Sequence, residues 1–167
     1  MATKLWVVLT VCCAIDEQSL EQASSIVSGI YREAGLELQL SNDFAGAVAN
    51  RTLTIVLTTR KAAPAGVRTD AMGVAPTPGD GTRGSVAYIF VDAVKEFADA
   101  HRIPIAHVLG CAIAHEIGHL LLPPNAHQPS GIMRGRWQPA DFPPSSAGIP
   151  GFPAEQAQLL RLRARSR

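Results

Sequence analysis

The sequence has little excess charge and no long apolar run. Its 167 residues include 15 lysines and arginines against 14 aspartates and glutamates, so the formal net charge is only +1. A chain this close to neutral gives no reason to expect nucleic acid or an acidic membrane surface as a partner. No apolar stretch approaches the length needed to cross a bilayer, which argues against a membrane-spanning protein.

Cysteines are also few. The three cysteines are an odd number and Cys12 and Cys13 are adjacent, which excludes a disulfide framework of the small secreted type. Cys111 lies one helical turn before His115. Because free cysteines are usually buried, we interpret Cys111 as a buried thiol and not as a metal ligand.

The composition is that of an ordinary globular chain, with 47% apolar and 17% charged residues. At this length the chain is most simply one domain, 1–167, with a sizeable core. Strand-like and helix-like patterns alternate along its first half. We predict a helix over 16–34 with Asp16 as its N-cap and Gly35 after its end. Strands are predicted over 36–40, 52–58 and 85–91.

The rest of the chain is expected to be more irregular, apart from two helices. Residues 62–84 are rich in Gly, Pro, Ala and Thr and indicate a surface loop, and 92–100 a short helix or turn. The strongly apolar segment 105–122 predicts a long buried helix that Pro123 and Pro124 stop. A loop over 134–152 precedes a closing helix, 153–165, with Ala157, Leu160 and Leu159 expected to face inward.

The first residues allow two interpretations. Lys4 followed by the apolar run 5–14 fits a short signal peptide over Met1–Ala14, which would make the protein secreted. The same valine-rich run fits a buried first strand, in which case a cytoplasmic protein is expected. We favour the strand because the run leads without a linker into the helix that begins near Asp16.

The motif His115-Glu116-Ile117-Gly118-His119 is the most informative part of the sequence. Two histidines four apart on a helix project from the same face, so both imidazoles can reach one Zn²⁺. Glu116 is placed to accept a proton from a zinc-bound water. The alternative is a pair of half-buried polar side chains, since so short a match also arises by chance.

A third protein ligand is needed, and His127 follows a few residues after the helix. The buried character of the helix, its stop at two prolines and the early arrival of His127 favour a zinc site. The two remaining histidines are not expected to take part. His107 lies two turns before His115 and has rotated away from the metal face, and His101 is expected at a helix end or on the surface.

With Gly131-Ile132-Met133 after His127, the chain resembles the metzincin zinc proteases. In that family a long helix supplies two histidines, a third follows a sharp turn, and a methionine turn forms a hydrophobic floor, here Met133. The family pattern places a glycine and the third histidine at the positions of Leu122 and Asn125. His127 comes two residues later, so Asn125 remains an alternative third ligand, although imidazole is the better zinc donor.

The resemblance implies an α+β fold: a twisted mixed sheet with a helix packed on it, the long active-site helix, and a small irregular C-terminal part ending in a helix. The N-terminal half would be 1–122 and the C-terminal half 123–167. Residues 85–91 would be the edge strand that borders the cleft and pairs with an extended peptide. Tyr88, Trp137 and Phe142 are candidates for the substrate pocket, although a core aromatic is as good an interpretation of Trp137 and Phe142.

The leading functional hypothesis is therefore a zinc-dependent endopeptidase acting on a peptide or protein substrate. His115, His119 and His127 would hold Zn²⁺, and Glu116 would be the general base. The rival hypothesis is a zinc-binding domain without peptidase activity, with a structural or peptide-binding role. An α/β module without metal is the third.

Overall fold

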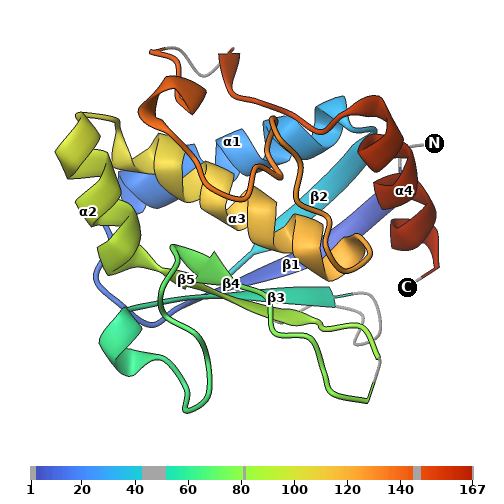
Figure 1. The fold of residues 1–167 in the computed structure, drawn as a ribbon, viewed down its shortest axis with the longest axis horizontal. Helices are drawn as coiled ribbons and strands as arrows, with labels where there is room; N and C mark the ends of the chain where they lie inside the picture. The colour runs from blue at the N-terminus through green and yellow to red at the C-terminus, as the bar shows by residue number, and fades with distance from the viewer. Residues whose placement is uncertain (1–2, 43–51, 81, 145–147, 167) are drawn as a thin grey trace.

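The computed structural model describes residues 3–42, 52–80, 82–144 and 148–166 (Figure 1). Within these residues the protein is an α+β structure with a five-stranded mixed sheet and four α-helices. The strands are β1 (Thr3–Val11), β2 (Leu36–Ser41), β3 (Thr52–Thr58), β4 (Gly73–Val74) and β5 (Val86–Phe90). The helices are α1 (Glu17–Glu33), α2 (Val91–His101), α3 (Ile105–Leu121) and α4 (Ala154–Arg165).

The strand order in the sheet is β2-β1-β3-β5-β4. The first four of these strands are parallel neighbours, and β4 pairs antiparallel with β5. β1 therefore has a paired strand on each side, as the strand interpretation of the first apolar run predicts. Its buried residues include Leu5, Val7 and Leu9, at the period of two that a sheet face requires.

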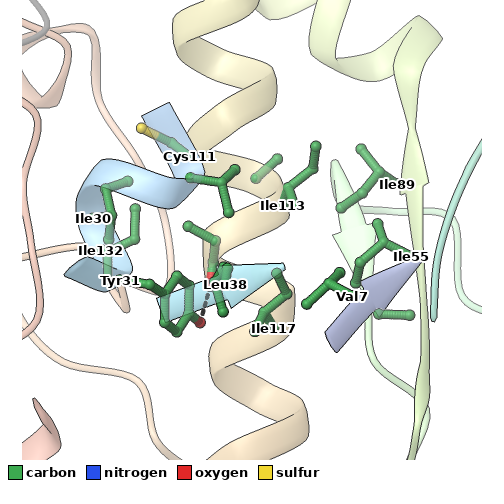
Figure 2. Packing of buried hydrophobic residues seen from close by; sticks show 14 of the residues in the cluster. Val7, Ile30, Tyr31, Leu38, Ile55, Ile89, Cys111, Ile113, Ile117 and Ile132 are labelled. Carbon is green, nitrogen blue, oxygen red and sulfur yellow. Dashed lines mark hydrogen bonds between the residues drawn. The ribbon is translucent and has the colours of Figure 1, made fainter. Parts of the chain in front are cut away.

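The helices lie over one face of the sheet, with α1 beside α3 (Figure 1). Asp16 caps α1 by accepting a hydrogen bond from the Ser19 N–H at 2.8 Å, and Gly35 follows its end with φ +81°. Figure 2 shows Ile113 and Ile117 of α3 facing the core side chains of the strands, among them Val7 and Ile55. This packing fixes α3 rigidly across the sheet.

Three expectations about the elements need correction. Residues 85–91 do not form the edge strand, because β4 pairs with β5 on the outside. β4 lies inside the segment 62–84, which is therefore not wholly irregular; the 3-10 helix η1 (Arg60–Ala62) begins just before it. Leu159 does not face inward: it is 38% exposed, whereas Leu160 is fully buried. One turn of α4 places only one of two adjacent leucines against the core.

No helix in the described part of the chain is both long enough and apolar enough to cross a membrane.

Candidate metal centre

The two histidines of the motif and Glu116 lie near the end of α3, on a helix that is buried along most of its length. His115 and Glu116 are themselves buried. The helix is fastened next to them by the buried Tyr31 of α1, whose hydroxyl donates to the Ala114 carbonyl at 2.9 Å (Figure 2). A rigid helix therefore sets the relative positions of His115 and His119 before any metal binds.

A short loop returns the chain from α3 and brings in the third histidine. α3 ends at Leu121, its C-cap Leu122 is extended, and Asn125 adopts a left-handed conformation with φ 62°. The next residue, Ala126, accepts a hydrogen bond at 2.7 Å from the buried Gln156 Nε2 of α4. Gln128 N–H donates to the Met133 carbonyl at 2.9 Å. Both residues adjoining His127 are thus held by hydrogen bonds.

The ligand atoms of His115, His119 and His127 converge to within 4.8 Å of one another. The His119 Nε2 lies 3.0 Å from the Nε2 of His115 and 3.0 Å from that of His127. Two nitrogens bound tetrahedrally to one zinc ion at roughly 2.0–2.1 Å would lie about 3.3 Å apart. The three imidazoles can therefore hold a metal ion with very small adjustments.

The tautomer of His115 is set by the main chain. Its Nδ1 lies 2.8 Å from the carbonyl oxygen of Ile132, which can only accept a hydrogen bond. Neutral His115 therefore carries its proton on Nδ1 and directs the Nε2 lone pair at the other two histidines. A backbone carbonyl behind a ligand histidine is a common orienting contact in metal sites.

Hydrogen bonds alone cannot satisfy the three nitrogens. His119 Nε2 carries at most one proton, so it can donate to only one of its two neighbours at 3.0 Å. Protonating the rings is disfavoured, because burial first and then the neighbouring histidines lower the pKa of His119 to about 4. Burial also lowers the pKa of His115 to about 4, with a smaller contribution from His127. Three imidazole nitrogens directed at one point are the kind of ligand set that holds a metal cation.

The carboxyl group of Glu116 is buried and has a shifted pKa. Its Oε2 is buried and has no hydrogen-bond partner among the described residues. Burial raises its pKa to about 8. Gly73 of β4 packs against it so closely that a Cβ there would lie 2.8 Å from both Cγ and Oε1 of Glu116. A buried, unpaired carboxyl group beside a metal-binding cluster is a typical feature of a reaction centre.

Met133 is fully buried and packs against α3 at Gly118. Gly118 makes room for it, since a Cβ on Gly118 would lie 2.5 Å from the Met133 sulfur. The turn before it has Gly131 at φ +81°, and Ile132 N–H donates to the Gly151 carbonyl at 3.1 Å. This turn thus supplies both the packing under α3 and the carbonyl that orients His115.

The three histidines and Glu116 open onto a cleft of about 840 Å³. One wall is formed by 68–75, including β4, and the opposite wall by 134–137. Trp137 lines the cleft with its ring edge-on to that of His115, at a centroid distance of 5.4 Å. Gly135 lies against the His127 ring, because a Cβ there would be 3.1 Å from Nδ1.

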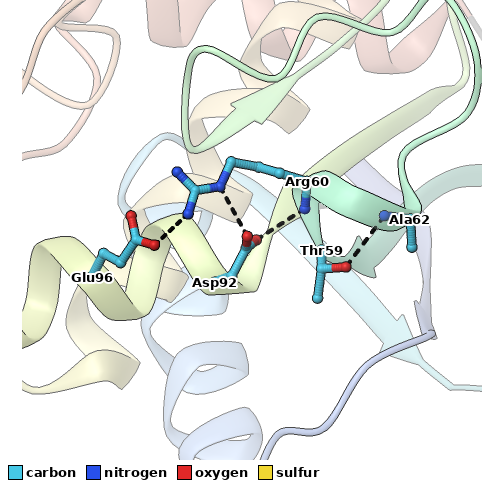
Figure 3. A network of polar contacts seen from close by, with 5 residues as sticks. All are labelled: Thr59, Arg60, Ala62, Asp92 and Glu96. Carbon is cyan, nitrogen blue, oxygen red and sulfur yellow. Dashed lines mark hydrogen bonds and ion pairs between the residues drawn. The ribbon is translucent and has the colours of Figure 1, made fainter.

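One wall of the cleft is tied to α2 by a polar network (Figure 3). Arg60 donates through Nε to Asp92 at 2.8 Å and also pairs with Glu96. Its backbone N–H donates to Asp92 as well, at 3.0 Å. The chain that leaves η1 toward β4 is therefore anchored where it begins.

The remaining candidates from the sequence lie elsewhere. Tyr88 does not line the cleft, because it alternates with Ala87 and Ile89, which face the core under α3. Phe142 is buried behind Trp137, at a centroid distance of 5.5 Å, and so is a core aromatic and not a lining residue. Asn125 is exposed and also lies outside the cleft lining.

Cys111, His101 and His107 lie outside the metal-binding cluster. Cys111 is buried, and burial raises the pKa of its thiol to about 12. His101 stacks on Phe97 at the end of α2, and its Nδ1 lies 2.9 Å from the Phe97 carbonyl.

Sequence reasoning missed the residues that support the site. Three such residues touch functional side chains or the loop that carries His127: Gly73, Gly135 and Gln156. In the sequence they lie far from Glu116, at separations of 43, 19 and 40 residues respectively. No local pattern marks Gly135 or Gln156. Only Gly73 gave a weak signal, since a glycine in a short strand often marks a close approach of another group.

The fold and the site together define an α+β protein in which three histidines that could hold a metal ion lie next to a buried glutamate. No known protein family matches the chain, and no curated protein is significantly similar to it in sequence.

Proposed function

We propose that the protein is a zinc-dependent endopeptidase of the metzincin type. The observation that carries the proposal is the convergence of three imidazoles in the lining of a cleft, beside a buried carboxyl group whose Oε2 has no hydrogen-bond partner among the described residues. Nitrogen-only donor sets of this kind suit zinc among the common protein metals. Three protein ligands, and not four, are the number found in catalytic zinc sites.

The chain's own residues would divide the work as follows. His115, His119 and His127 hold the metal, which when bound lowers the pKa of a water molecule and polarises a carbonyl group. Glu116 accepts the proton from the attacking water and later delivers it to the leaving amine. Burial raises the pKa of Glu116 to about 8 in the metal-free chain, and a cation bound to the neighbouring histidines would lower it again toward the ionised form that a base requires.

The cleft also fits an extended peptide. β4 is the outermost strand of the sheet within the described residues, and it lines the cleft next to Glu116. A peptide laid along an exposed strand binds through main-chain hydrogen bonds, whatever its sequence. In this proposal β4 takes the role that the resemblance to metzincins implied for 85–91.

The test is the Glu116→Gln variant in a digest of a broad peptide library, followed by mass spectrometry with and without a chelator. We expect the zinc-loaded parent to cleave, the chelated parent to be inactive, and the variant to lose activity by about 10²-fold or more. The variant should still bind one zinc ion per chain. Glu21→Gln, which changes an exposed carboxylate on α1, is the matched control and should keep full activity.

Each other outcome has a definite meaning. A Glu116→Gln variant as fast as the parent would show that Glu116 is not the base. A zinc-loaded parent that cleaves nothing would favour the rival function, a zinc-binding domain without peptidase activity. A purified protein that takes up no stoichiometric zinc would rule out both.

A further inference from the structure

The cleft that contains the metal-binding cluster is lined by four arginines, Arg60, Arg68, Arg134 and Arg136. Three of them are neutralised by a carboxylate. Arg60 pairs with Asp92 and Glu96, Arg68 with Asp70 at 2.6 Å, and Arg134 with Asp141 at 2.8 Å. Arg136 is exposed and has neither an ion pair nor a hydrogen bond within the part of the chain that the structure describes.

The backbone of Arg136 lies between two residues that contact the histidines. Gly135 lies against the ring of His127, and the ring of Trp137 packs edge-on to that of His115. Arg136 is therefore held between two residues that touch the proposed metal ligands. Of the acidic residues that line the cleft, Asp70 and Glu96 are already paired with arginines, and Glu116 is buried. Among the described residues, the cleft lining thus presents one cation, Arg136, without a counter-charge.

We propose that Arg136 is a specificity-determining residue that binds a carboxylate of the substrate peptide near the bond that is cut. This inference rests on the proposed peptidase function and names its substrate class, peptides with an acidic group. A guanidinium group is suited to this task, because its planar N–H groups pair with both oxygens of a carboxylate. The carboxylate comes either from an Asp or Glu side chain or from the C-terminus of the peptide.

The experiment compares the parent with Arg136→Gln, Arg136→Lys and Arg32→Gln. The last removes the same charge from an exposed position on α1, away from the cleft. The substrates are capped alanine hexapeptides with a single Asp or Asn at each position in turn. A second pair, alanine hexapeptides with a free or an amidated C-terminus, separates the two sources of carboxylate.

For the parent we expect a preference of about three- to tenfold in kcat/KM for Asp over Asn at one or two adjacent positions. The difference should lie mainly in KM. Arg136→Gln should abolish the preference, Arg136→Lys should keep part of it, and Arg32→Gln should leave it unchanged. The preference should shrink between about 0.01 M and about 1 M salt, because exposed charges are screened. A preference only for the free C-terminus would identify that carboxylate as the ligand.

A binding measurement keeps this inference separate from the peptidase function. The same peptides, fluorescently labelled, are titrated against the zinc-loaded Glu116→Gln variant with and without Arg136→Gln. Asp-dependent binding that needs Arg136, without cleavage by the parent, would support the inference and overturn the peptidase. Cleavage by the parent that is equal for Asp and Asn, and for free and amidated ends, would overturn the inference alone.

Discussion

At the scale of single residues, close approaches of backbone to side chain define the site. Gly73 allows β4 to lie against the carboxyl group of Glu116, and Gly135 allows the opposite wall to lie against His127. Neither residue carries a reactive group. At each glycine, the backbone fills the space into which the neighbouring functional side chain could otherwise rotate.

If the protein is the peptidase that we propose, Gly73→Ala should impair hydrolysis more than the fold. Its Cβ would lie 2.8 Å from Glu116 Oε1, so the carboxyl group must shift. We expect kcat to fall by about 10-fold to 100-fold, with zinc stoichiometry unchanged. Peptide hydrolysis measured beside metal analysis tests this. Gly79→Ala is the matched control because its Cβ meets nothing within 4 Å; equal loss of activity in both variants would contradict the prediction.

At the scale of elements, the site joins α3 to the turn at Gly131-Ile132-Met133. Met133 packs against α3 where Gly118 has no side chain, and Ile132 orients His115. A hydrogen bond from the Ile132 N–H to the Gly151 carbonyl holds this turn close to the start of α4. Displacing the turn should therefore disturb both stability and the metal ligands.

Gly118→Ala should be destabilising although alanine is the better helix former. A Cβ at 2.5 Å from the Met133 sulfur forces that fully buried side chain to shift, and overpacking of this kind costs about 1–3 kcal/mol. Gly29→Ala in α1 is the control, because its Cβ meets nothing within 4 Å. It should stabilise by up to about 1 kcal/mol. Urea unfolding of the two metal-free variants should give shifts of opposite sign; shifts of the same sign would refute this account.

The elements also show what sequence can reveal. Strong periodic patterns predicted the long elements α1, β3 and α3 and the convergence of His115 and His119, because a helix fixes residues four apart. β4 was missed since two residues carry no periodicity. Without β4, residues 85–91 were expected to form the edge of the sheet, whereas β4 lies outside β5. Contacts such as Gly73 with Glu116 depend on the tertiary path of the chain, which no local spacing encodes.

At the scale of the whole molecule, folding shifts the pKa values of the histidines and of Glu116 in opposite directions. Burial lowers the pKa of His115 and His119 to about 4 and raises that of Glu116 to about 8. The folded protein without metal therefore favours neutral forms of all three groups. Its stability must depend on pH in a direction set by these shifts.

Comparing the metal-free parent with Glu116→Gln should reveal the contribution of Glu116. The ordinary pKa of 4.5 is raised to about 8 on folding, so the folded chain binds the proton more tightly. The stabilisation is fully present below pH 4.5 and is lost as the pH rises through about 8. The slope is at most about 1.4 kcal/mol per pH unit. Urea unfolding in chelator should show the parent losing stability relative to the variant between pH 5 and 8; parallel curves would refute it.

The contact between His115 and the Ile132 carbonyl has a consequence for how the protein tolerates mutation. Every amino acid brings an identical carbonyl, so no codon change at position 132 can delete the acceptor. The tautomer of His115 is thus set by the path of the backbone and not by the identity of any side chain. Substitutions of side chains around His115 leave this hydrogen bond in place as long as they preserve the backbone path at residue 132.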